Sequence, residues 1–232
     1  MARYTTAYSA FVARLNEVET LRRYAAGEER TNPVGRRNEI NALCRGAVVL
    51  LSGHLEAYIK KLGETALDSM TAKNVPRTNI SQRLYYHISK DLLNEIQDTA
   101  DPEKIAGKVF SFLDSDLEYW SKTGPFPKVI PTERFNKGFA NPAFTKIKKY
   151  FNRFGYTDYQ DDLAKRLQAN YLPTVNMVDH LVDTRNKIAH GDPAASETPA
   201  EVKTMISITQ NFCGSTDAVF ATWWKTNFCA IR

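Results

Sequence analysis

Apolar side chains recur along this chain at the i, i+3 and i+4 spacing of an α-helix, and no stretch shows the sustained alternation of a β-strand. The longest pattern spans residues 36–70. Its apolar stripe consists of Ile40, Leu43, Cys44, Ala47, Val48, Leu51, Leu55, Tyr58, Ile59 and Leu62. The stretch "GAVVLLSG" at 46–53 is apolar or small on every side, which predicts a central, buried helix. Small residues would let another helix approach it closely at Gly46, Ser52, Gly53 and Ala57.

The same periodicity predicts the other elements. Helices are expected from about Thr6 to Tyr24, at 80–97, 102–121 and 142–154, and from Pro173 to His190. A last helix begins with a capping box at "TPAE", 198–201, and reaches Trp223 and Trp224. Residues 123–142, rich in Pro and Gly, are expected to form a long ordered loop. The chain is therefore predicted to be one all-α domain over 1–232, a helical bundle with 36–70 and 173–190 as core helices and 124–155 as an insertion.

Composition narrows the class of protein. With 43% hydrophobic and 25% charged residues, the 232-residue chain is typical of a soluble globular protein. Its three cysteines are too few for a disulfide framework, and neither CxxC nor HxxxH occurs. The N-terminus lacks a signal-peptide core, and the longest aliphatic run is "AVVLL" at 47–51. We therefore expect a cytoplasmic protein with reduced thiols and with no metal, cofactor or membrane contact.

The charge is unevenly distributed. Residues 128–153 contain seven basic residues and one acidic residue, a net charge of +6 in a chain whose total is +5. The rings of Phe135, Phe139, Phe144, Tyr150, Phe151 and Phe154 lie among or beside these cations. Cations interleaved with aromatics suit a nucleic-acid surface, although the rings could equally form core with a basic rim. The expected RNA contacts are Lys146, Lys148, Lys149 and Arg153, together with Lys187 on the 173–190 helix.

The stretch "DTRNKIAHGDP" at 183–193 closes that helix. Basic residues, a glycine and a proline in this order are typical of a helix C-terminus. At about 100° per residue, Arg185 falls in the middle of an apolar face formed by Val178, Leu181, Val182, Ile188 and Ala189. Because an isolated buried charge costs several kcal/mol, Arg185 must either meet a carboxylate or line a site that binds an anion.

A second, polar column stands beside the apolar face, formed by Asp179, Asp183, Asn186 and His190. Arg185 and His190 are then about 140° apart on one straight helix, so they do not easily reach the same atom. Two copies of the helix packed together would pool two arginines and two histidines. This geometry predicts a homodimer with the site on its two-fold axis.

The available chemistry is limited, because no phosphate-cradling Gly-rich loop and no nucleophile elbow is present. Cleavage of RNA without a metal needs a base for the 2′-hydroxyl, an acid for the leaving 5′-oxygen and a cation for the phosphorane. Histidine can perform either proton transfer, and arginine suits the phosphate. Asn186 could bind a phosphate oxygen or orient the histidine.

Three segments resemble one known family. "RNKIAHG" at 185–191 resembles the R-[polar]-x-x-x-H signature of the HEPN superfamily. "RGAVVLLSGHLEAYIKKL" at 45–62 is similar to the first core helix of its RiboL-PSP-HEPN branch, and "NPAFTKIKKYFNRFG" at 141–155 to the stretch before its motif helix. The three follow in the right order and cover roughly residues 40–195.

This resemblance implies an all-α, commonly dimeric protein of a group that includes many metal-independent endoribonucleases of toxin–antitoxin, abortive-infection and other defence systems. It implies that Arg185 and His190 are catalytic, that Asn186 assists and that Glu56 contributes; alternatively, Glu56 pairs with Arg185 or Arg45 or is simply exposed. The other histidines, His54, His87 and His180, are expected to be structural. RNA is the expected partner, with a possible antitoxin or regulatory protein.

Two other functions are compatible with the same residues. One is a non-catalytic helical module that binds RNA, a nucleotide or a protein through the same groove. The other is a plain interaction protein in which "RNKIAHG" is only a capped helix end, which would leave Arg185 on an apolar face without a purpose.

Overall fold

A computed structural model describes residues 4–231, and within that range the chain is helical and contains no β-strand. The α-helices are α1 (Thr6–Thr31), α2 (Arg37–Ala72), α3 (Gln82–Gln97), α4 (Pro102–Asp116), α5 (Thr132–Asn136), α6 (Phe144–Asn152), α7 (Tyr159–Leu167), α8 (Tyr171–Ala189) and α9 (Pro199–Asn227). Short 3₁₀ turns η1 (Arg77–Asn79), η2 (Leu117–Trp120) and η3 (Gln168–Asn170) join some of them. The predicted all-α fold class is confirmed.

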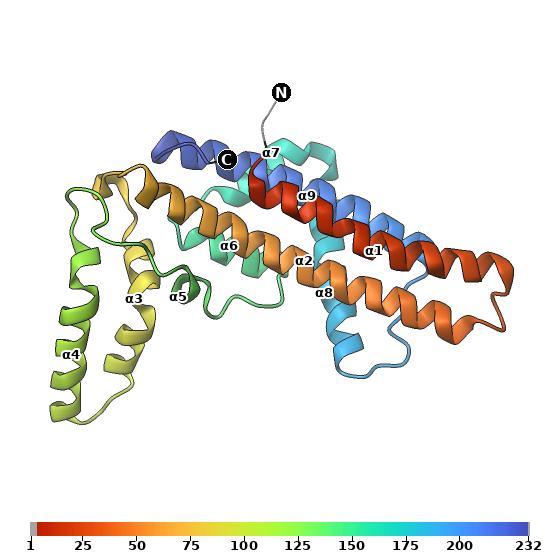
Figure 1. Cartoon of the computed structure of the whole chain (residues 1–232), viewed down its shortest axis with the longest axis horizontal. Coiled ribbons are helices and arrows are strands. Elements are labelled where there is room, and N and C mark those ends of the chain that lie inside the picture. The colour runs from red at the N-terminus through yellow and green to blue at the C-terminus, as the bar shows by residue number, and fades with distance from the viewer. Residues whose placement is uncertain (1–3, 232) are drawn as a thin grey trace.

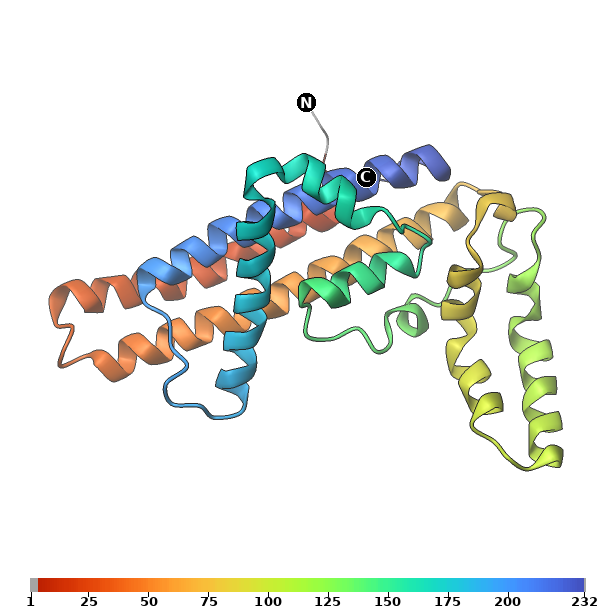
Figure 2. The same cartoon turned by 180° about the vertical axis from the view of Figure 1, so that it is seen from behind.

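The long helices α1, α2 and α9 lie side by side, and α6, α7 and α8 cover one face of this layer (Figures 1 and 2). Helix α8 packs against both α2 and α9 and crosses α2, so that its C-terminal half extends beyond the layer (Figure 2). By length and composition α2 could cross a membrane, and 44% of its most apolar stretch is buried inside the structure. The prediction that 46–53 is buried on every side is wrong, because Val49 is 39% and Leu50 36% exposed. The crossing places α8 against α2, while the motif at the C-terminal end of α8 projects past the layer (Figure 2).

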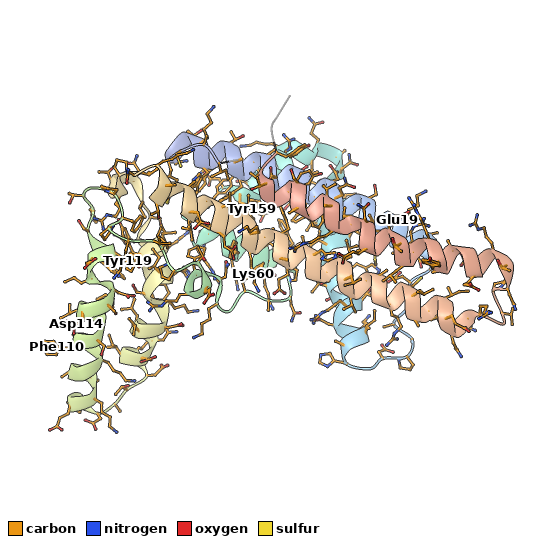
Figure 3. The ribbon with its side chains drawn as sticks, viewed as in Figure 1. Glu19, Lys60, Phe110, Asp114, Tyr119 and Tyr159 are labelled. Carbon is orange, nitrogen blue, oxygen red and sulfur yellow. The ribbon has the colours of Figure 1, made fainter. Side chains whose placement is uncertain are left out.

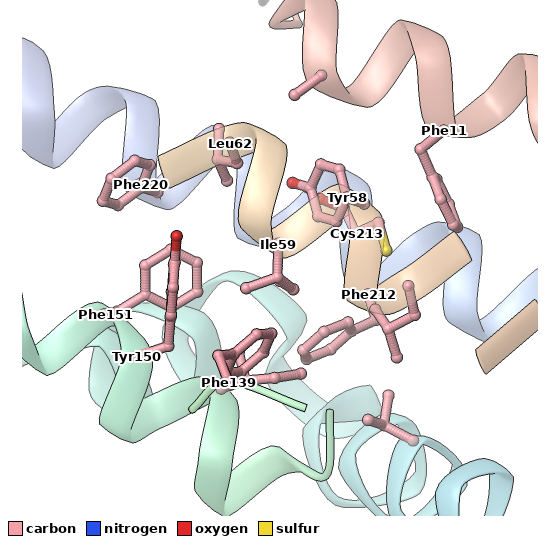
Figure 4. Packing of buried hydrophobic residues seen from close by; sticks show 14 of the residues in the cluster. Phe11, Tyr58, Ile59, Leu62, Phe139, Tyr150, Phe151, Phe212, Cys213 and Phe220 are labelled. Carbon is pink, nitrogen blue, oxygen red and sulfur yellow. The ribbon is translucent and has the colours of Figure 1, made fainter. Parts of the chain in front are cut away.

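The core is a single aromatic-rich cluster between the layer and its covering helices. Figure 4 shows Tyr58, Ile59 and Leu62 of α2 facing Phe139, Tyr150 and Phe151, with Phe212 and Phe220 of α9 closing the sides. All six rings of the basic segment are at most 6% exposed, namely Phe135, Phe139, Phe144, Tyr150, Phe151 and Phe154. The interpretation of these rings as base-stacking groups is therefore wrong. These rings belong to the core, because an aromatic side chain stabilises the fold more when it is buried than when it is exposed on the surface.

Helices α3 and α4 form a separate hairpin that projects from the end of α2 (Figure 1). Its base is fixed by the buried Arg77, which donates hydrogen bonds to the main-chain carbonyls of Glu118, Thr123 and Gly124. Phe110 is 66% exposed and lies with Asp114 on the outer side of α4 (Figure 3). The most protruding part of the molecule is therefore this hairpin, whereas residues 124–155 pack into the core.

Element boundaries differ from the sequence prediction in four places. The helix expected over 102–121 ends as α4 at Asp116 and is followed by the 3₁₀ turn η2. Helix α1 continues past Tyr24 through the half-buried Gly27 to Thr31, because a glycine weakens a helix interior without ending it. The predicted loop 123–142 contains the short helix α5. Helix α7 was not predicted, because its nine residues bury only Tyr159, Leu163 and Leu167, too short a pattern to distinguish from a loop.

The glycines of α2 supply a test of the packing. A methyl group on Gly63 would overlap the hydroxyl of the fully buried Tyr150, whereas one on Gly53 would meet nothing within 4 Å. We expect Gly63→Ala to lower the free energy of unfolding by about 1–3 kcal/mol through overpacking. Gly53→Ala should raise it by about 0.5–1 kcal/mol through helix propensity alone. Urea unfolding measures both, and equal effects for the two variants would contradict this packing.

Candidate active site

The end of α8 carries the motif in a defined geometry. Gly191 has φ +81°, its N–H donates to the carbonyl of Ile188, and the N–H of Asp192 donates to the carbonyl of Lys187. This double closure is a Schellman motif, which needs the left-handed conformation that glycine adopts without strain. The helix end predicted from "AHGDP" is therefore confirmed, and His190 is the C-cap residue.

The Arg185 guanidinium is half-buried and oriented by two side-chain amides. Its Nη1 donates to Oδ1 of Asn141 at 2.9 Å and to Oδ1 of Asn186 at 3.1 Å. Within residues 4–231 it has no carboxylate at ion-pair distance, and its Nη2 and Nε make no hydrogen bond. Of the two predicted alternatives, the carboxylate partner is absent from the described residues. One edge of the guanidinium is left available to an anion.

Glu56 is connected to Arg185 through the loop that joins α5 to α6. Its Oε2 accepts a hydrogen bond from the main-chain N–H of Asn141 at 3.1 Å. Its Oε1 accepts one from Lys60 at 2.6 Å, one turn further along α2 (Figure 3). Neither Arg185 nor Arg45 is its partner, so the expected pairing of Glu56 with an arginine is not found among the described residues. The Glu56 carboxylate anchors the α5–α6 loop, and the side chain of Asn141 in this loop contacts Arg185.

His190 lies at the exposed end of the same helix, and its side chain makes no hydrogen bond within the described part of the chain. The turn that follows it is held by Arg45 of α2. The Nη1 of Arg45 donates to the main-chain carbonyls of Asp192 at 2.7 Å and Ala195 at 3.0 Å. The backbone around the histidine is therefore fixed, while its imidazole is accessible.

The residues of the polar column predicted beside the apolar face make different contacts. Asp179 accepts a hydrogen bond from the N–H of Phe144 at 2.8 Å, so it caps the first turn of α6 from another helix. Asn186 is bound to Arg185, whereas Asp183 is exposed. The apolar face that carries Arg185 is buried at Val178, half-buried at Ile188 and exposed at Ala189. It therefore opens to solvent toward the motif end.

The predicted RNA-binding cations differ in their exposure and in their hydrogen-bond partners. Lys146, Lys149 and Lys187 are exposed, while the ammonium of Lys148 donates to Gln160 of α7 at 2.9 Å. Arg153 donates to the main-chain carbonyls of Phe135 and Lys137 and lies over the rings of Phe135 and Tyr150. Burial lowers the pKa of its guanidinium. These contacts tie Arg153 to its own basic segment, and its role as an RNA contact stays a prediction.

The remaining histidines lie away from the motif. His54 is 3.4 Å from a carboxylate oxygen of Glu17, and burial lowers its pKa. Burial lowers the pKa of His87 to about 4, next to the ring of Phe135. His180 lies 3.0 Å from Glu197. Residues 4–231 contain no group of three or more His, Cys, Asp or Glu side chains that could hold a metal ion.

Two residues of the site were not found from the sequence. Asn141 stands in a loop without periodicity, and its one signal is the "NP" dipeptide, which marks a turn but no chemistry. From the sequence, Arg45 is expected only as a possible partner of Glu56. Both act over long sequence separations, which helical periodicity cannot reveal.

Comparison with protein families agrees with this architecture. The RiboL-PSP-HEPN family model matches residues 10–222, nearly the whole chain and all the residues of the site. The chain therefore belongs to the RiboL-PSP-HEPN family, a HEPN-type helical domain, and the predicted family is confirmed. Comparisons with curated proteins and with solved structures gave no significant match. HEPN domains are commonly ribonucleases.

Proposed function

We propose that this protein is a metal-independent endoribonuclease that cleaves single-stranded RNA and leaves a 2′,3′-cyclic phosphate. The observation that carries the proposal is the Arg185 guanidinium, which is oriented by two neutral amides, keeps one edge free and lies five residues before an exposed histidine. A planar guanidinium is suited to a phosphate, which it binds with paired, charge-assisted hydrogen bonds.

The reaction requires two proton transfers and the stabilisation of a charged intermediate. A base removes the 2′-hydroxyl proton as its oxygen attacks phosphorus, and an acid protonates the 5′-oxygen as its bond to phosphorus breaks. His190 can serve in either step, and Arg185 would balance the charge on the phosphorane oxygens. Asn186 orients Arg185 through its amide oxygen. Glu56 contributes through the α5–α6 loop rather than by contact with RNA.

The site is proposed to form between two copies of the chain. The side chains at 185 and 190 are about 140° apart on a regular helix, and the helix stays regular up to Ala189. The apolar face around Arg185 becomes more exposed toward its C-terminal end, where Ile188 is half-buried and Ala189 is exposed. Two such helix ends facing each other would cover these residues and bring one copy's histidine to the other's arginine.

The biological setting is part of the same proposal. A cytoplasmic toxin or defence effector of the abortive-infection kind is the role that the family suggests, with an antitoxin or regulatory protein as its partner. The competing function is a HEPN module that binds RNA, a nucleotide or a protein without cutting. Incubation of single-stranded RNA with wild type and with His190→Ala in the presence of EDTA distinguishes the two. Binding without cleavage would support the competing function.

RNA binding should depend on the exposed lysines of α6. Lys146 and Lys149 are exposed, and Lys146 also donates to the carbonyl of Ala140 at 3.2 Å. Lys148 is half-buried and bound to Gln160, and it serves as the matched control. Lys146→Gln with Lys149→Gln should weaken binding for every RNA sequence and reduce the slope of log affinity against log salt by about 1.4, two phosphates at about 0.7 each. Lys148→Gln should change the slope little. Filter binding at several salt concentrations measures both, and equal slopes for all proteins would refute this surface.

A further inference from the structure

The loop between α5 and α6 carries one residue in an unusual backbone conformation. Asn141 has φ +53°, a left-handed conformation that non-glycine residues rarely adopt and that asparagine tolerates better than most. The buried Pro142 follows it, and the carbonyl of Asn141 accepts a hydrogen bond from the N–H of Ala143 at 2.8 Å. This tight turn determines where the Asn141 side chain lies.

Both ends of the loop are held by glutamates of α2. Asn136 donates through Nδ2 to Glu64 at 2.9 Å and accepts from the hydroxyl of the buried Tyr150 at 2.6 Å. Glu56, eight residues before Glu64, accepts from the main-chain N–H of Asn141. Because α2 packs against α1, α8 and α9, the loop is attached to a rigid element. The Asn141 amide therefore approaches Arg185 from a fixed position.

The chemistry of this contact matters because the acceptor is neutral. An amide oxygen orients the guanidinium through one hydrogen bond but leaves its full positive charge uncompensated. A carboxylate at the same place would orient it equally well, yet would form an ion pair and compete with any incoming phosphate. The second amide on the same nitrogen, Asn186, is neutral too.

We propose that Asn141 is a positioning residue for Arg185: its neutral side chain fixes Nη1, so that Nη2 and Nε stay free and charged for an RNA phosphate. The inference rests on the proposed function of the site. It also assigns Glu56 an indirect role, because that carboxylate holds the main chain of Asn141 and makes no contact with Arg185 among the described residues.

Two substitutions separate positioning from simple packing. Asn141→Asp keeps the shape and the acceptor but adds a negative charge. Asn141→Gly keeps the backbone conformation, since glycine adopts positive φ freely, but removes the acceptor. If Asn141 only supported the loop, the isosteric Asp variant would be the milder change. Our inference requires the opposite order: Asn141→Asp should weaken RNA binding at least tenfold, and Asn141→Gly should weaken it less.

The probe is a fully 2′-O-methylated single-stranded RNA, which cannot be cleaved, so binding is measured independently of activity. For Asn141→Asp the salt slope should fall by about 0.7, the loss of one phosphate contact, as in Arg185→Ala, whereas Asn141→Gly should keep the wild-type slope. In an Arg185→Ala background the Asp substitution should have little further effect, because its target is gone. Circular dichroism and urea unfolding verify that each variant is folded.

The outcomes distinguish this inference from the proposed function. If wild type cleaves RNA but the Asn141→Asp variant binds the probe at least as tightly as the Asn141→Gly variant, the inference is wrong and the proposed function stands. If wild type binds the probe with the expected variant order but does not cleave natural RNA, the positioning role stands and the nuclease activity falls. A wild-type protein that neither binds nor cleaves RNA overturns both.

Discussion

Replacing His190 or Arg185 with alanine should reduce RNA cleavage by about a thousandfold or more while leaving the protein folded. Removal of a general acid or base typically costs 10²–10⁴ in rate, and removal of a charge-stabilising donor about 10²–10³. His190 is exposed and its side chain makes no hydrogen bond within residues 4–231, so its removal leaves no buried group without a partner. Arg185 donates hydrogen bonds to two amides that are themselves only half-buried.

The control for this expectation is a histidine on the same helix. His180 is half-exposed and lies beside Glu197, ten residues before His190. His180→Gln should retain cleavage within about threefold, because surface substitutions away from a site have small effects. Initial rates on a fluorescent RNA, together with thermal unfolding of each variant, provide the comparison. Cleavage by His190→Ala at the wild-type rate would exclude the histidine from the chemistry.

The second large effect concerns the assembly. Since each inactive variant retains the group that the other lacks, mixing Arg185→Ala with His190→Ala should restore activity well above that of either alone. Random exchange of subunits makes about half of the dimers mixed, and only these contain an intact arginine and an intact histidine. The mixture should therefore exceed both parents by at least tenfold after equilibration.

Molar mass supplies the other half of this test. Light scattering should give twice the 26.3 kDa chain mass at concentrations where cleavage is full, and specific activity should fall on dilution as dimers dissociate. A monomer that cleaves RNA at full specific activity would show that one helix end is sufficient. The argument from the angular separation of Arg185 and His190 would then be wrong.

The sequence predicted the elements whose signals are local. Helix α2 follows from its long apolar stripe, the start of α9 from the capping box at Thr198 and Glu201, and the end of α8 from Gly191. Each of these depends on neighbours within about one turn, where propensity and capping dominate. Helix α7 was missed because its few buried residues are also consistent with a loop.

The site could be predicted only in part. Arg185, Asn186 and His190 lie on one helix, so their spacing is readable, and Glu56 was found through the family resemblance. The contact from Arg185 to Asn141 joins residues 44 positions apart through an irregular turn, which no periodicity encodes. The burial of the basic segment's aromatics was ambiguous for the same reason: both a core and a stacking surface require large rings.

The most direct test of the central claim is the chemistry of the cleaved ends. Single-stranded RNA is incubated with wild type in EDTA, and the products are identified by mass spectrometry, with His190→Ala in parallel. We expect fragments ending in a 2′,3′-cyclic phosphate and beginning with a 5′-hydroxyl from wild type, and intact RNA from the variant. Intact RNA from both proteins, or products with a 3′-hydroxyl and a 5′-phosphate, would contradict the account.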